Sequence, residues 1–358
     1  MSVLRAVIAA LCTRLMIAQE RSKSRLRAER ISAKMRLCWK VLIVAVVLAV
    51  PAASQAATCT SQAELSPQDR ATLSSVGGRM AQAVVNQDIA TLQAALLPAE
   101  TAEWTGIRGA IEQSAPMVKG GHAQLRSIYL LDASSQTATA DTQLFCSNAA
   151  GTLTVTVNMH ALPPGRYAVV FADANGAPMQ GQIGIILAWD GQSWRLGGVS
   201  THPGAFDGHD GVWFWTRARA LAAVDPWSAW YSYDAAHFLL LPFDFVSSPN
   251  LEKLLKEQTD IQNSPQNAFP YSLAAGDRTW KIDSVALDPT LNQSDLALAY
   301  ESSGVTDSAA LRTEAIAVFS AFLKAQPGIR ANFHGLWAYA VKDGKRTPVM
   351  ELPMAQIP

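Results

Sequence analysis

The chain of 358 residues lacks the short motifs that mark the most common catalytic and cofactor sites. It contains no HExxH, no phosphate-binding GxxxxGK and no CxxC. The stretch from Gly191 to Arg195, GQSWR, begins like a nucleophile elbow, but it lacks the second glycine and falls in an expected hairpin. The sequence therefore indicates no cofactor and no metal, and it favours a non-enzymatic protein.

Positive charge is scarce outside the N-terminal segment. Residues 1–56 carry ten Lys and Arg against two Glu, which leaves 19 basic and 27 acidic residues in the rest of the chain. This excess of acidic residues argues against a nucleic-acid partner, because such proteins carry clustered positive charge.

The apolar run of the N-terminal segment, residues 41–50, is too short to span a bilayer, which takes about 20 residues. It follows basic residues and precedes a stretch of small ones, an order typical of a secretory signal peptide. We expect residues 1–56 to be a signal peptide with an extended basic n-region, with Met35 as an alternative true start. The protein would then be exported, to the periplasm or the extracellular space, and only an uncleaved signal segment would hold it to a membrane.

Cysteine is rare as well. Of the four cysteines, only Cys59 and Cys146 lie beyond the expected signal peptide. An exported protein with one remaining pair favours a disulfide, so we expect Cys59 and Cys146 to be bonded to each other. Two unrelated buried thiols are the alternative.

The first part of the exported chain changes from helical to strand periodicity. Ser66 suits a helix N-cap and Pro67 the first helical position, and apolar residues follow at spacings of three and four. A short second helix ending at Pro98 and a third helix over about 100–118 are also expected. From residue 124 the period becomes two, which predicts strands over 125–131, 142–147, 152–160, 166–173, 182–189 and 193–200.

Two stretches in this region, AVVNQDIATLQAALLP and GQIGIILAWDGQSWRLGGV, give residues 66–200 a pattern that resembles the nuclear-transport-factor-2-like fold. The resemblance implies a curved antiparallel sheet that wraps a long helix into a cone with a pocket. Enzymes of this fold commonly use one carboxylate in the pocket as a base, and Asp141, Asp173 and Glu103 are candidates for it. A β-sandwich is the alternative fold, which LPPGRYAVVFADANG would suit equally.

Tryptophan is concentrated in one place, because four of the ten fall within residues 208–242. The spacing predicts two helices, over residues 211–224 and 226–241, with Asp210 and Asp225 as N-caps. Because aromatic side chains bury large areas, we expect this hairpin to be a packing hub. It resembles a single tetratricopeptide unit at Trp213, Ala229, Tyr233 and Ala236, but an array needs about three repeats.

The whole chain is predicted to be α+β, with an order of domains set by composition and periodicity. We expect a cone-like domain over 57–205, a Trp-rich helical hairpin plus a helix over 206–258, a linker over 259–277, and a small ββαββ domain over 278–358.

The loop before the hairpin holds the candidate ligand-binding residues: His202, Asp207, His209, Asp210 and Trp213. Imidazoles and carboxylates this close together are able to hold a divalent metal, and the helix N-terminus is able to receive an anion with help from His209. The alternative is that Asp210 only caps the helix and the histidines are exposed loop residues.

The leading functional hypothesis is an exported, non-enzymatic binding or assembly protein whose partner is a protein or a small molecule. The alternative is a small-molecule isomerase, lyase or hydrolase with a carboxylate in the cone pocket. A filled cone and an exposed apolar groove near the hub would favour binding. A deep apolar pocket with one buried carboxylate would favour the enzyme.

Overall fold

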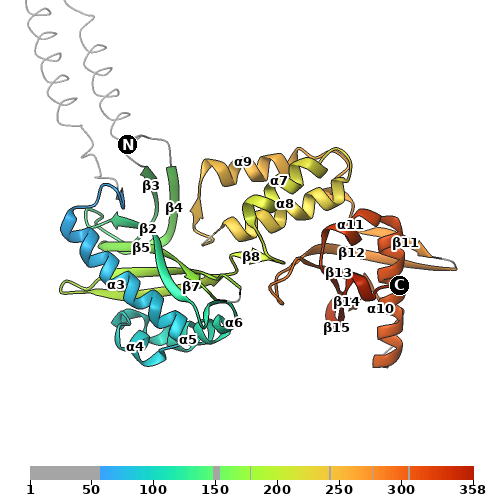
Figure 1. The fold of residues 1–358 in the computed structure, drawn as a ribbon, viewed down its shortest axis with the longest axis horizontal. Coiled ribbons are helices and arrows are strands. Elements are labelled where there is room, and N and C mark those ends of the chain that lie inside the picture. Colours follow the sequence, from blue (N-terminus) through green and yellow to red (C-terminus); the bar gives the residue numbers. More distant parts are fainter. Residues whose placement is uncertain (1–56, 148–153, 178, 242, 276, 305–306) are drawn as a thin grey trace, which may run out of the picture. The chain divides into compact units, whose positions relative to one another are not determined.

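The computed structural model describes residues 57–147, 154–177, 179–241, 243–275, 277–304 and 307–358 (Figure 1). The expected signal peptide, residues 1–56, lies outside these ranges. Helices and mainly antiparallel sheets are combined in the described ranges, which confirms the predicted α+β class. None of the helices described there has the length and apolar character needed to cross a bilayer.

The first long helix begins where the sequence predicts. Helix α3 (Pro67–Asn86) is capped by Ser66, whose Oγ accepts a hydrogen bond from the backbone N of Asp69 at 3.0 Å. Short helices then lead to the first sheet: α4 (Ile89–Ala94), the 3-10 helix η1 (Pro98–Glu103), α5 (Trp104–Gln113) and α6 (Ala115–Val118).

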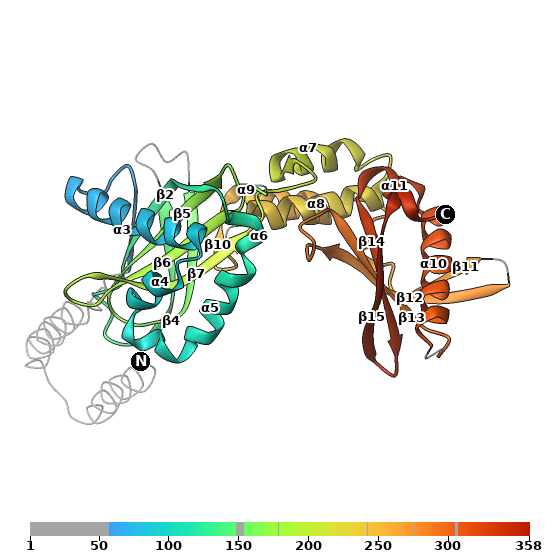
Figure 2. The same ribbon diagram turned by 60° about the horizontal axis from the view of Figure 1, so that its bottom comes forward.

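An antiparallel first sheet forms the centre of the N-terminal domain, in the order β1-β2-β5-β6-β7. Its strands are β1 (Thr58–Ser61), β2 (His122–Asp132), β5 (Arg166–Asn175), β6 (Gln182–Trp189) and β7 (Trp194–His202). Helix α3 lies along one face of this sheet (Figures 1 and 2). Apolar residues of α3 and of that face form one continuous buried cluster.

A second sheet covers part of the opposite face, in the order β10-β4-β3. It consists of β3 (Ala140–Ser147), β4 (Thr154–Leu162) and the two-residue β10 (Val246–Ser247). Tyr129 and Phe171 of the first sheet share a buried cluster with Leu144 and Val157 of the second. The domain therefore has a helix layer, a sheet and a second sheet, which combines elements of both folds that the sequence left open.

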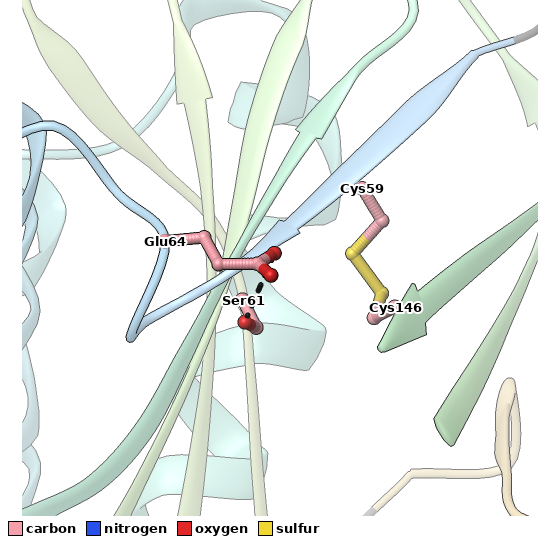
Figure 3. The surroundings of a disulfide bond; sticks show 4 residues. All are labelled: Cys59, Ser61, Glu64 and Cys146. Atoms are coloured by element: carbon pink, nitrogen blue, oxygen red, sulfur yellow. Dashed lines mark hydrogen bonds between the residues drawn. A yellow bond between two sulfur atoms is a disulfide. The ribbon is translucent and has the colours of Figure 1, made fainter. Parts of the chain in front are cut away.

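The predicted disulfide is present and joins the two sheets. Cys59 on β1 and Cys146 on β3 form the bond, with their Cα atoms 5.0 Å apart (Figure 3). Nearby, Ser61 donates a hydrogen bond to Glu64 across the turn that follows β1.

The helical hairpin follows the two-residue strands β8 (Ala205–Phe206) and β9 (His209–Asp210). It consists of α7 (Gly211–Leu221) and α8 (Pro226–Leu240), with α9 (Pro249–Thr259) packed beside α8. Both predicted caps are confirmed, because the Asp210 side chain accepts from the backbone N of Trp213 at 2.8 Å and that of Asp225 from Ser228 at 3.2 Å.

The tryptophans of the hairpin are less buried than other aromatic residues beside them. Trp213 is 40% exposed, and the other three are half-buried. The fully buried aromatic side chains of the hairpin are Phe214, Tyr231 and Tyr233. The hairpin is a packing hub, but phenylalanine and tyrosine form its centre and tryptophan its margins.

The sequence pattern predicted that the N-terminal domain ends at residue 205. In the structure, a later segment pairs with this domain. Strand β10 pairs with β4 beyond the hairpin, with Val246 opposite Val157. Phe243 packs against Gly184, where a Cβ would lie 2.1 Å from the Phe243 ring. Residues 243–247 therefore complete this domain. The prediction failed here because a two-residue strand has no periodicity of its own.

The C-terminal domain has one strand more than the predicted ββαββ unit. Its sheet has the order β11-β12-β13-β14-β15, and α10 lies along one face (Figure 2). Its elements are β11 (Tyr271–Ala275), β12 (Arg278–Asp288), β13 (Asp295–Glu301), α10 (Ser308–Ala325), α11 (Pro327–Asn332), β14 (Gly335–Lys342) and β15 (Lys345–Pro353), with 3-10 turns η2 (Pro265–Asn267) and η3 (Met354–Gln356). The additional strand, β11, lies within the predicted linker, which is therefore shorter than expected.

Candidate functional site

A groove with largely apolar walls lies between the N-terminal domain and the helical hairpin. Its volume is about 320 Å³. The sheets, the hairpin and the segment that joins them all contribute to its lining: Arg126, Ser127, Tyr129, Val155, Phe171, Val212, Trp215, Leu240, Val246, Ser247, Ser248, Asn250 and Leu251. The groove is large enough for a small ligand or a few side chains of a peptide.

Arg126 lines the groove from a β-bulge in β2. Leu125 of β2 is opposite Ala172 of β5, and Ser127 is opposite Phe171, so Arg126 is the extra residue between them. A bulge turns its side chain out of the regular alternation and is a frequent feature beside binding sites. Arg126 also lines two further surface depressions.

Neighbouring side chains hold the Arg126 guanidinium in place. One Nη lies 3.3 Å from a carboxylate oxygen of Asp173, and the other donates to Gln182 Oε1 at 3.0 Å. Its Cζ lies 5.9 Å from the centre of the Phe171 ring. A guanidinium has five N–H donors, and these two partners use only some of them. Arg126 is therefore positioned to bind a hydrogen-bond acceptor in the groove.

The polar groups of the groove remain neutral, apart from this ion pair. Burial raises the pKa of Tyr129, against the opposing effects of a hydrogen bond with Ser127 and the charge of Arg126. Tyr129 therefore stays a neutral phenol at physiological pH. The groove thus combines largely apolar walls with one lining cation, which suits an apolar ligand carrying an acceptor or an anionic group.

The opposite face of the first sheet is covered by α3. Leu73, Met80 and Val84 of α3 are buried there against the sheet. A Cβ on Gly77 would lie only 2.9 Å from Val170 Cγ1. The space that a cone pocket would occupy is filled along this helix.

The three carboxylates considered for a pocket base do not converge. Glu103 lies exposed at the end of η1, and Asp141 is exposed on β3. A hydrogen bond from the backbone N of Ala161, together with nearby His160, lowers the pKa of Asp141. Asp173 binds Arg126 at the edge of the groove.

The fold brings His209, Asp210 and Trp213 together, whereas His202 and Asp207 have other partners. The His202 ring packs 5.5 Å from that of Phe238, and its Nδ1 is buried without a hydrogen-bond partner. Burial lowers the pKa of His202, so its imidazole is neutral at physiological pH, although the charge of Asp244 opposes this effect. His209 points elsewhere and stacks on Trp213, with ring centres 3.8 Å apart.

The two aspartates of the loop also have separate partners. Asp210 caps α7, as described above. Asp207 accepts hydrogen bonds from the backbone N and the side-chain hydroxyl of Ser294, which belongs to the C-terminal domain. These side chains therefore do not form the joint site that their spacing suggested.

Sequence reasoning missed Arg126, although a signal for it is present. The apolar residues of β2 that face α3 are Ala123 and Leu125, then Ile128 and Leu130. The step of three between Leu125 and Ile128 breaks the period of two, and such a break indicates a bulge.

Comparison with known proteins adds no assignment. No protein-family model matches the chain, and neither a curated protein nor a solved structure matches it.

Proposed function

We propose that this chain is an exported, non-enzymatic binding or assembly protein, and that its ligand occupies the groove beside the helical hairpin. The observation that carries the proposal is that Arg126 lines a largely apolar groove from a β-bulge. The ligand is a small molecule, or a short segment of another protein, with an apolar part and an acceptor or anionic group. Nucleic acid is not a partner, since the body of the chain is acidic.

Export is part of this proposal. The disulfide between Cys59 and Cys146 supports it, because such bonds persist in oxidising compartments. We also propose that α3 and the first sheet are a variant of the nuclear-transport-factor-2-like fold. In this variant the helix fills the cone, and the second sheet and the hairpin form the binding surface on the opposite face.

The groove can be tested with an anionic aromatic probe, 8-anilinonaphthalene-1-sulfonate. Its fused rings match the apolar walls and its sulfonate matches Arg126. We expect the exported chain to bind it with a rise in fluorescence, and Arg126→Gln to weaken binding by about tenfold, because a hydrogen bond to a charged group contributes about 1.5 kcal/mol.

Two exposed valines provide a matched pair. Val212 lines the groove and is 57% exposed, whereas Val224 is 78% exposed and does not line it. We expect Val212→Glu to weaken binding of the anionic probe and Val224→Glu to leave it unchanged. Equal binding by both glutamate variants and by Arg126→Gln would show that the groove is not the binding site.

A further inference from the structure

Three side chains of the kinds that bind metals meet at one end of the C-terminal sheet. Asp295 begins β13, His334 directly precedes β14, and Glu351 lies on β15. One ligand atom from each lies within 4.8 Å of the other two. This is the one such group of three or more among the residues that the structure describes.

Strand pairing brings these distant residues together. Strands β13 and β14 run parallel with Leu296 opposite Leu336, so the residues before them, Asp295 and Gly335, lie side by side. Strands β14 and β15 are antiparallel, and Glu351 is opposite Trp337. Because side chains alternate between faces, Asp295 and Glu351 lie on the face opposite the buried Leu296 and Leu336.

Asp295 is buried and Glu351 is half-buried, and each has one buried carboxylate oxygen without a partner. The Asp295 side chain is 0% exposed, and its Oδ1 lies 2.8 Å from His334 Nδ1. Its second oxygen, Oδ2, is buried and has no hydrogen-bond partner, and the same is true of Glu351 Oε1. Buried charges are normally paired, hydrogen-bonded or bound to a metal, so these two oxygens are free to receive a cation.

Gly335 provides the room for both carboxylates. A Cβ at this position would lie 2.8 Å from Asp295 Oδ1 and 2.8 Å from Glu351 Oε1. Its backbone is not in the left-handed region, so the conformation alone does not require glycine. The space that a side chain would fill is the space between the two carboxylates.

We propose that Asp295, His334 and Glu351 bind a divalent transition-metal ion, for which Zn²⁺ fits best. One imidazole nitrogen and two carboxylate oxygens match zinc ligand chemistry, whereas Mg²⁺ and Ca²⁺ favour oxygen alone. Ligand atoms bonded to one Zn²⁺ at about 2.0–2.2 Å lie roughly 3–3.5 Å apart, so the side chains need only small movements. Three protein ligands leave a coordination position for water or a bound ligand.

Hydrogen bonds beside the three side chains hold the backbone at this end of the C-terminal sheet. Ser294, which precedes Asp295, donates to Asp207 from both its backbone N and its hydroxyl, and the backbone N of His334 donates to Ser294 O at 3.1 Å. Such second-layer contacts orient metal ligands and hold their backbone in position. The site lies outside the groove described above and does not depend on its function.

The test uses the whole exported chain, stripped with a chelator and titrated calorimetrically with ZnCl₂. We expect one Zn²⁺ per chain, a higher melting temperature with Zn²⁺, and a visible absorption band when Co²⁺ is used in its place. Glu351→Gln and His334→Ala should each weaken Zn²⁺ binding by more than about 100-fold, because loss of a direct ligand exceeds the effect of an outer contact. Gly335→Ala should do the same by filling the space between the carboxylates.

His209→Ala is the control, since its imidazole is exposed in the loop before α7. This variant should bind Zn²⁺ as the unchanged chain does. Circular dichroism and cooperative unfolding identify variants that have lost their fold. Among the folded variants, the Zn²⁺ affinity of Glu351→Gln decides the test, because this is the most conservative change and lies at a partly exposed position. Absence of stoichiometric Zn²⁺ binding, or unchanged affinity in folded Glu351→Gln, would overturn the proposal.

Discussion

Gly77 of α3 lies directly against Val170 of β5. A Cβ on Gly77 would be 2.9 Å from Val170 Cγ1 and 3.0 Å from Cγ2. Real Cβ contacts are longer, so any other residue here would push the helix away from the sheet or force Val170 out of place. This contact accounts for a glycine in the middle of a helix, where it otherwise costs about 1 kcal/mol relative to alanine.

Two neighbouring glycines should therefore respond in opposite ways. Gly77→Ala should lower the free energy of unfolding by about 1–2 kcal/mol, since overpacking outweighs the better helix propensity. Gly78→Ala should raise it by about 0.5–1 kcal/mol, because its Cβ would lie 3.8 Å from Leu125, an ordinary contact. Urea unfolding of both variants checks this. The interpretation fails if Gly77→Ala is as stable as Gly78→Ala.

The disulfide should contribute strongly to stability. Cys59 and Cys146 are 87 residues apart, and closing a loop of that size stabilises by about 4 kcal/mol on the chain-entropy model. The double variant Cys59→Ala/Cys146→Ala should therefore unfold at a much lower urea concentration. Dithiothreitol should lower the midpoint of the unchanged chain to a similar value and leave the double variant unaffected. Two free thiols in material purified without reductant would contradict the bond.

Asp234 should make stability depend on pH. Burial raises its pKa from 3.8 to about 6, although a hydrogen bond from Gln258 opposes the effect. Between about pH 4 and 6 the folded chain keeps this proton while the unfolded chain releases it. The contribution of Asp234 to the free energy of unfolding is therefore fully present below pH 4 and is lost as the pH rises through 6.

Asp234→Asn isolates this contribution, because the amide oxygen is still able to accept the hydrogen bond from Gln258. The free energy of unfolding of the variant minus that of the unchanged chain should grow by about 2 kcal/mol from pH 4 to pH 7. Urea unfolding at a series of pH values measures the difference. A difference that is constant across this range would mean that the pKa of Asp234 is not raised.

Trp227 and Trp213 should differ in their effect on stability. The Trp227 ring lies 5.8 Å from each of the Phe269 and Tyr271 rings and 6.1 Å from that of Phe322, so it joins the hairpin to the C-terminal core. Trp227→Ala should cost about 3 kcal/mol, near the lower end for buried aromatic residues. Trp213→Ala should cost less than about 1 kcal/mol, because Trp213 is 40% exposed. Thermal melts that rank the two variants in the reverse order would contradict the packing described here.

Local features of this fold are predictable from the sequence. The three predicted N-caps are Ser66, Asp210 and Asp225, and each caps the helix that follows it. Such caps are predictable because they depend on residues within one helical turn. The strand from 182 to 189 is found with its predicted bounds, since its apolar run lies between turn residues. The disulfide follows from counting cysteines in a chain that is expected to be exported.

Features that depend on pairing between distant segments are not predictable in this way. Strand β11 was hidden in a polar stretch, because a short edge strand with a few buried residues has little periodicity. Asp295, His334 and Glu351 are scattered over more than fifty residues, and they meet only because β14 pairs with β13 on one side and with β15 on the other. Spacing along the chain instead drew attention to the loop histidines, which the fold separates.

The return of the chain to the N-terminal domain after the hairpin has a consequence for cleavage. Phe243 packs on Gly184 and β10 pairs with β4, so the chain leaves the N-terminal domain to form the hairpin and then returns to it. A single protease cut in the turn between α7 and α8 would therefore produce two fragments that stay together, since the second fragment still supplies the Phe243 ring and β10 to the first. Fragments made separately, 57–223 and 224–358, should reassociate, whereas a second fragment that begins after residue 247 should not.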